Sequence, residues 1–307
     1  MASIMTNASA MTALQSLNET NKQLDITQGR ISTGYRVATA SDNAAYWSIA
    51  TTMRSDNKAN SVVQDALGLG AGKVDTAYTA MNSAIEVVDQ IKQKVLLAKT
   101  SSPADRAKIQ SEIKTYQDQL KDTIGGASYA GSNLLETDST STDTTLNIIS
   151  SYNRDATGAV VTGSIDIDYA NIRLIDSNAA SAGILDKAGT ASTRSLLNLD
   201  VETLTGATGA TDDLKFDNLL TDVEATLAAM TTAASELGAG KARIDLQKDF
   251  VGKLMDSIER GVGQLVDADM NKESTRLQAL QVQQQLGIQS LAIANGNSQS
   301  ILSLFKG

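Results

Sequence analysis

The chain has 307 residues, of which 41% are apolar and only 4% aromatic, so its core must consist of aliphatic side chains and alanine. It contains neither cysteine nor histidine, which excludes disulfides, thiol nucleophiles, most zinc sites and histidine-based acid–base catalysis. The formal net charge of −9 argues against nucleic acid as a partner, because phosphate binding requires a basic face. No apolar run approaches the roughly 20 residues of a membrane span, and residues 1–7 lack the features of a secretory signal peptide.

The two ends of the chain differ from its middle. Residues 1–50 and 257–307 each have a net charge of zero, so the acidic excess belongs to residues 51–256. Both ends carry a seven-residue helical repeat. The N-terminal repeat comprises Ala10, Leu14, Leu17, Asn21, Leu24, Gln28 and Ile31. The C-terminal repeat comprises Met270, Leu277, Gln284, Leu291, Ser298 and Phe305, with Ile288, Asn295 and Leu302 at companion positions.

Such repeats fit either an ordinary core-facing helix or a coiled coil. We expect the ends to pair with each other, and we expect the amides of Asn21, Gln28, Gln284 and Asn295 to fix the register at some cost in stability. Neither repeat is apolar enough to form a strong coiled coil alone.

Longer helical patterns lie between the ends. They run through residues 74–95, through residues 109–124 after the only proline, Pro103, and through residues 219–265. A helix of some 40 residues is roughly 60 Å long. The predicted fold class is therefore mainly α, a long rod-like helical bundle.

Residues 136–215 read differently. A polar run at 136–143 breaks the helical pattern, and alternating segments at 164–169 and 172–175 predict short strands between glycines. This region is predicted to be a small β-containing insert.

Four local features resemble functional sites but fit structural roles better. Residues 68–73 (GLGAGK) lack the first glycine and the final Ser or Thr of a phosphate loop, so we interpret them as a close-packing point. Residues 267–271 begin like a calcium loop, but the turn position is Lys272. Asp42 and Asn43 are interpreted as helix caps, and Trp47 as buried packing. No catalytic constellation, metal site or cofactor site is predicted.

Residues 1–100 and 216–307 resemble the two ends of bacterial flagellins, the subunits of the flagellar filament. The resemblance rests on residues 29–37 (GRISTGYRV), 237–239 (LGA), 267–269 (DAD), 281–287 (QVQQQLG) and 301–305 (ILSLF), and its motif at 29–50 is similar to that of alphaproteobacterial flagellins.

The resemblance implies five segments. Residues 1–45 and 262–307 would form an inner coiled coil, residues 46–135 and 216–261 a helical bundle, and residues 136–215 an exposed module. The residues expected to mediate inner coiled-coil assembly are Leu14, Leu17, Asn21, Leu24, Gln28, Ile31, Gln284, Ile288, Leu291, Asn295, Leu302 and Phe305. Those expected in bundle and subunit packing are Arg30, Arg36, Asp42, Trp47, Val74, Met81, Ile85, Val88, Ile244, Val251, Leu254 and Ile258.

The resemblance further implies an extracellular filament that serves swimming motility. It implies export without a cleaved signal through the flagellar channel, a chaperone that covers Leu291, Leu302 and Phe305, and cap and hook-junction partners. Recognition by immune receptors is not expected, because Asn43, Tyr46–Trp47 and Ile91 depart from the usual motifs.

Two alternatives remain open at this point. A hook–filament junction protein shares the paired ends, although the Gln-rich C-terminal stretch favours the filament subunit. A secreted coiled-coil adhesin or effector would have no need for two matched ends. A protease insert, which some flagellins carry, would need histidines that this chain lacks.

Overall fold

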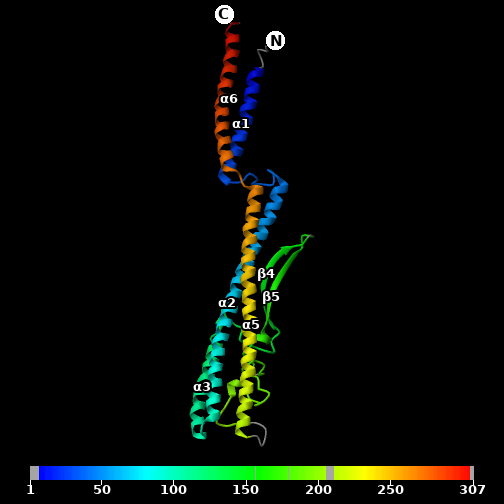
Figure 1. The fold of residues 1–307 in the computed structure, drawn as a ribbon. Helices are drawn as coiled ribbons and strands as arrows, with labels where there is room; N and C mark the ends of the chain where they lie inside the picture. The colour runs from blue at the N-terminus through cyan, green and yellow to red at the C-terminus, as the bar shows by residue number, and fades with distance from the viewer. Residues whose placement is uncertain (1–6, 156, 179, 205–210, 305–307) are drawn as a thin grey trace. The chain divides into compact units, whose positions relative to one another are not determined.

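A computed structural model describes residues 7–155, 157–178, 180–204 and 211–304, with side chains in the last helix described as far as residue 296. The chain divides into two compact units (Figure 1). The terminal unit comprises Met1–Asn57 with Asp256–Gly307, and the central unit comprises Lys58–Met255. The finer division into five segments stays a prediction.

The terminal unit contains two helices that lie side by side, α1 (Ala8–Thr33) and α6 (Met270–Leu304) (Figure 1). The Asn7 side chain caps α1 by accepting a hydrogen bond from the Ala10 N–H at 3.0 Å. The helix ends at Gly34, whose φ of 74° lies in the left-handed region that glycine adopts without strain. Asp269 caps α6 by accepting from the Asn271 N–H at 3.0 Å.

The central unit is built on three helices that share one aliphatic core: most of α2 (Ala44–Thr100), α3 (Pro103–Gly125) and most of α5 (Asp212–Val266). Pro103 begins α3, as predicted, where its missing N–H costs nothing. The predicted bundle residues that are fully buried here are Val74, Met81, Val88, Ile244 and Val251. Ile85 packs against this core, and Leu254 is half-buried.

Salt bridges line the exposed rim of the bundle. Lys92 pairs with Glu224 and Lys94 with Glu112, both at 2.5 Å. Each of these hydrogen bonds raises the pKa of the lysine above its usual value. Because the lysines stay solvated, such pairs contribute little stability.

The insert is confirmed as a strand-containing region. Its main element is the antiparallel hairpin of β4 (Thr145–Arg154) and β5 (Val160–Asp168), with a register shift between Ile149 and Ser151. The short strands are β1 (Ser128–Tyr129) with β2 (Ser132–Asn133), and β3 (Glu136–Thr137) with β6 (Ile175–Asp176). A 3₁₀ turn, η1 (Leu196–Asn198), follows.

The prediction of a strand over residues 172–175 is wrong for residues 172–174, since only Ile175 lies in a strand, β6. Residue 172 ends a single helical turn, α4 (Tyr169–Ile172), which Asp168 caps by accepting from the Ala170 N–H at 2.9 Å. The N–H groups of Leu174 and Ile175 both donate to the Leu135 carbonyl, and the pairing with β3 begins only at Ile175. The alternation reflects the burial of Ile172 and Leu174 in the core, which does not require a strand.

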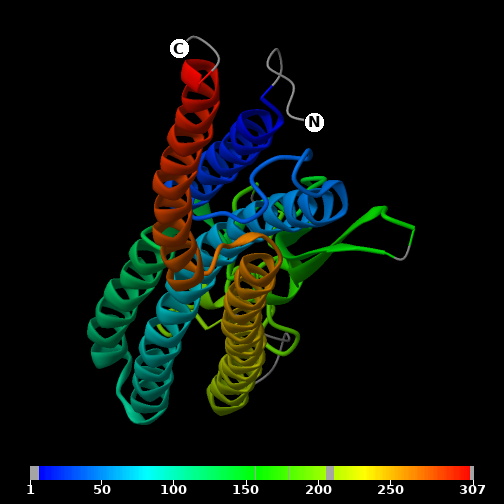
Figure 2. The same ribbon diagram turned by 90° about the horizontal axis from the view of Figure 1, so that it is seen from above.

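Glycines in the long helices allow the insert to pack closely on them. A Cβ at Gly70 would lie 2.5 Å from Cδ1 of Ile148 in β4, and one at Gly240 would lie 2.9 Å from Cδ1 of Ile167 in β5. A Cβ at Gly72 would lie 2.7 Å from the Tyr129 ring. The interpretation of residues 68–73 as a close-packing point is therefore confirmed. Figure 2 shows the green β4–β5 hairpin projecting away from the helices of the central unit.

This packing predicts opposite effects for two neighbouring substitutions in α2. Gly70→Ala should destabilise the central unit by about 1–3 kcal/mol, because the whole Ile148 side chain must move. Gly68→Ala, where nothing lies within 4 Å, should stabilise it by up to about 1 kcal/mol through helix propensity. Urea unfolding followed by circular dichroism measures both, and equal effects would contradict the packing role of Gly70.

Candidate functional site: the paired terminal helices

Helices α1 and α6 run antiparallel and are joined by polar contacts, among them a hydrogen bond at 2.9 Å from the Arg276 guanidinium to the Gln23 side-chain oxygen. The Asn7 side chain donates to the Ala294 carbonyl at 2.9 Å, and the Gln284 amide donates to the Asn21 side-chain oxygen at 2.7 Å. Near the other end, Arg30 Nη1 donates to Glu273 Oε1 at 3.2 Å. The predicted pairing of the two chain ends is therefore present in the single chain.

The positions that face the partner helix only partly match the predicted repeats. Leu17, Leu24 and Ile31 of α1 and Leu277, Gln284 and Leu291 of α6 are buried or half-buried, as the repeats imply. Each repeat has a second inward-facing position, and in both helices it lies one residue before the position that the sequence predicted. These second positions are Ala13, Thr20 and Thr27 in α1, and Glu273, Leu280, Gly287 and Ala294 in α6.

Four residues expected in the coiled-coil seam lie outside it in the single chain: Leu14, Gln28, Ile288 and Asn295 are exposed. The reason is close packing. Small residues let the helices approach, and a Cβ at Gly287 would lie only 3.1 Å from Cδ1 of Leu17. The expectation that Gln28 and Asn295 fix the register is not supported by any contact between the helices, whereas Asn21 and Gln284 do pair. The side chains of Ser298 and Leu302, and all of Phe305, lie outside the described residues.

The seam contains little apolar surface. Among the described side chains of the two helices, those below one-tenth exposure are Leu24, Thr27, Glu273 and Leu280. Burying a leucine contributes about 1.5–3 kcal/mol, whereas ordering one residue costs about 1–2 kcal/mol of backbone entropy alone. Two leucines offset only a small part of the ordering of two long helices, so further apolar contacts would stabilise the pair.

Large apolar side chains point away from the seam. We define the outer apolar face as the following residues: Met11, Leu14, Ile26, Met270, Val282, Leu286, Ile288 and Ile293. Met11 is 64% exposed and Ile293 is 65% exposed. Exposed apolar residues that recur along both helices are typical of an interaction surface.

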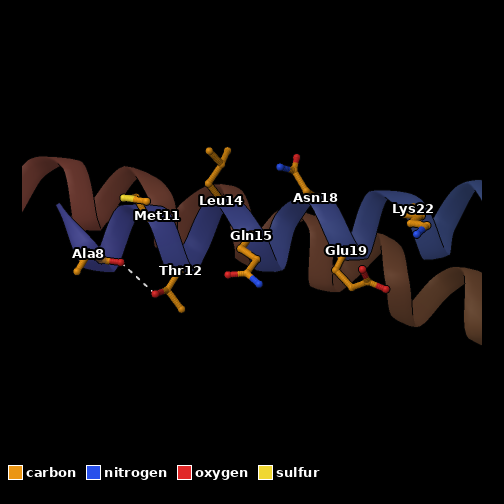
Figure 3. A pocket seen from close by; sticks show the side chains of 8 residues that line it. All are labelled: Ala8, Met11, Thr12, Leu14, Gln15, Asn18, Glu19 and Lys22. Atoms are coloured by element: carbon orange, nitrogen blue, oxygen red, sulfur yellow. Dashed lines mark hydrogen bonds between the residues drawn. The ribbon is translucent and has the colours of Figure 1, made fainter. Parts of the chain in front are cut away.

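On α1, part of this face forms a shallow groove of about 680 Å³. Figure 3 shows Met11, Leu14 and Asn18 on one side of the helix, with Gln15 and Glu19 beside them. All the lining residues belong to α1, so the groove is a feature of one helix surface and not an enclosed pocket. It offers an apolar strip with polar flanks, which suits another helix better than a small ligand.

Short connections link these helices to α2 and α5. The Ala268 N–H donates to the Gly34 carbonyl at 2.8 Å, and the Arg36 guanidinium donates to the Leu265 carbonyl at 3.0 Å. Beside them, a small apolar cluster contains Val37, Ala50, Val262 and Val266, with Ile258 packed against it.

Two expectations for this connection need correction. Asn43 caps α2 by accepting from the Tyr46 N–H, but Asp42 accepts from the N–H groups of Ala38 and Thr39 and so closes a turn. The Thr39 backbone bond is the main cause that lowers the pKa of Asp42. Trp47 is 38% exposed and lies outside the cluster, which α2 meets through Ala50 and Met53.

The described residues contain no group of three or more acidic side chains placed to hold a metal ion. None of the described helices has the length and apolarity needed to cross a bilayer.

Comparison with known proteins agrees with this geometry. The model of the bacterial flagellin N-terminal helical region matches residues 4–140, and that of the bacterial flagellin C-terminal helical region matches residues 220–305. A flagellin of Brucella melitensis is 51% identical over the full length of both chains. The chain belongs to the bacterial flagellin family.

Other relatives place this flagellin among those of alphaproteobacteria. Flagellin C of Rhizobium meliloti is 48% identical, again over the full length of both chains. Among solved structures, a putative flagellar hook-associated protein from Vibrio parahaemolyticus has a TM-score of 0.52 and 17% identity, and the match covers 74% of this chain and all of that one. That likeness concerns the fold alone.

The seam and the outer face predict different effects for two leucines of α1. Leu24→Ala should weaken the α1–α6 pair by about 2 kcal/mol, because Leu24 is buried between the helices. Leu14→Ala should change the free chain by less than about 0.5 kcal/mol, because Leu14 faces solvent. Amide hydrogen exchange along α1 measures both, and a larger effect at Leu14 would contradict the observed seam.

Proposed function

We propose that this flagellin is the structural subunit that polymerises into the bacterial flagellar filament, the helical propeller for swimming. The observation that carries the proposal is the outer apolar face, which lies on the helices that match the family and is exposed in the single chain. A second copy of the chain that covered this face would supply the apolar contacts that the α1–α6 seam lacks.

The association must be open-ended. Identical subunits that join through two different surfaces form helical fibres unless the rotation closes a ring. The filament subunit is favoured over a hook–filament junction protein, because the full-length relatives from Brucella and Rhizobium are flagellins. No observation favours a secreted adhesin or effector.

The location and further partners are also proposals. The filament is extracellular, and the subunit reaches it through the flagellar export channel without a cleaved signal. An export chaperone would cover the C-terminal helix, where Ile288 and Ile293 of the outer apolar face are exposed. Cap and hook-junction proteins would contact the two ends of the filament. The chain has no catalytic role in this proposal.

Seeded polymerisation tests the proposed function. Purified full-length chain, mixed with sonicated filament fragments, should grow into long fibres visible by electron microscopy. Chains that lack residues 1–33 or 270–307 should remain monomeric, because each loses one of the paired helices.

A double variant, Leu14→Gln with Ile288→Gln, tests the outer apolar face. It should raise the critical concentration for growth at least tenfold while the circular dichroism of the monomer stays unchanged. The matched control is Leu246→Gln, which alters an exposed leucine of α5 in the central unit. Normal filament growth by either truncated chain would refute the proposal. Normal growth by the double variant would show that the outer apolar face takes no part in assembly.

A further inference from the structure

We infer that the ion pair between Arg30 and Glu273 sets the register in which α1 pairs with α6. The two side chains are 3.2 Å apart, and the Glu273 side chain is only 9% exposed. Its second oxygen, Oε2, is buried without a hydrogen-bond partner. Glu273 therefore depends on Arg30 for the neutralisation of its charge.

The apolar residues of the seam do not define a single register. Leu17, Leu24 and Ile31 are spaced by seven residues, and so are Leu277, Gln284 and Leu291. A slip of one helix by seven residues brings inward-facing positions opposite one another again. The apolar contacts alone would then tolerate a displacement of about 10 Å along the helix axis.

The backbone bond from the Ala268 N–H to the Gly34 carbonyl opposes such a slip at the connected ends of the helices. Along the helices themselves, the polar side chains remove the ambiguity. If α6 slips by seven residues in one direction, Arg30 comes opposite Leu280, and Glu273 passes beyond the end of α1 at Thr33. A slip in the other direction brings Glu273 opposite Gln23, while Arg30 comes opposite residue 266, before the start of α6 at Met270. Either slip breaks the ion pair, and a carboxylate that stays buried without its partner costs about 3–5 kcal/mol.

The amide pair between Asn21 and Gln284 contributes less. In the slipped register Asn21 comes opposite Leu291, and an unpaired buried amide costs about 1–3 kcal/mol. The amides are half-buried and can bond to water, whereas the Glu273 carboxylate is enclosed. The ion pair is therefore the stronger determinant of register.

A half-satisfied buried ion pair is a poor source of stability, because desolvation of the charges offsets their attraction. Replacing both residues by apolar ones should leave the helix pair about as stable as before but allow more than one register. The consequence for the filament rests on the proposed function: a slip moves Ile288 relative to Leu14 and so changes the outer apolar face that a second copy would meet.

Engineered cysteine pairs report the register directly, because the chain has no cysteine of its own. Leu17→Cys with Gly287→Cys reports the observed register, since the Leu17 Cβ and a Cβ built on Gly287 are 3.8 Å apart, a separation suited to a disulfide. Leu17→Cys with Ala294→Cys reports the register slipped by seven residues. The effective concentration of each disulfide is measured in the full-length free chain in a glutathione buffer, without any need for filaments.

The unaltered ion pair should favour the observed-register disulfide over the slipped one by at least a hundredfold. Arg30→Met with Glu273→Leu should reduce that preference at least tenfold with little change in helicity. The charge-swapped variant, Arg30→Glu with Glu273→Arg, should restore it. The matched control is Lys272→Met, which removes an exposed positive charge of α6 near the ion pair and should change nothing.

An unchanged preference in the variant without the ion pair would overturn the inference, as would failure of the charge swap to restore it. Either result would leave the proposed function intact, because the disulfides are formed before assembly. Conversely, suppose that a chain prefers the observed-register disulfide as expected and still forms no filaments. That result would count against the proposed function alone.

Discussion

The antiparallel contact between α1 and α6 is the interaction on which this account depends. It brings together the two ends of a 307-residue chain through small side chains, with Leu17 against Gly287 and only two leucines below one-tenth exposure among the described side chains. Close approach of the helix backbones leaves little room for large apolar residues in the seam. Further apolar residues, among them Met11, Leu14 and Ile288, are exposed outside the seam on the same two helices.

The central unit follows a different principle. Its core is aliphatic and fully enclosed, and the residues at the crossing points with the insert are glycines of α2 and α5. This unit buries most of its large apolar side chains within the single chain. The contrast between an enclosed central core and an under-packed terminal pair agrees with a subunit that folds in part alone and in part through assembly.

Much of the fold could be predicted from the sequence. The periodicity of residues 74–95 and 219–265 predicted long helices, because a buried stripe at helical spacing admits few other structures. The pairing of the two ends followed from matched, neutral seven-residue repeats. The interpretation of residues 68–73 as a packing point followed from the residues that a phosphate loop requires and this chain lacks.

The details of the site could not be predicted in the same way. A repeat with steps of three and four residues leaves two choices for the second seam position, which are adjacent in the sequence. The sequence favours the choice with the larger side chain. The structure uses the other choice, with Ala13 and Gly287 in the seam and Leu14 and Ile288 outside. Only the spacing of small residues in both helices could have indicated this. The pairing of Arg30 with Glu273 carried no local signal, because 243 residues separate them.

Oxidation of methionine by hydrogen peroxide tests the central claim most directly. Met11 is 64% exposed on the outer apolar face, whereas Met81 and Met230 are fully buried in the central core and serve as internal references. The account predicts that Met11 oxidises rapidly in the free chain and at least tenfold more slowly in filaments, while both references stay slow throughout. Equal rates for Met11 in the free chain and in filaments would show that assembly does not cover the outer apolar face, and would contradict the account.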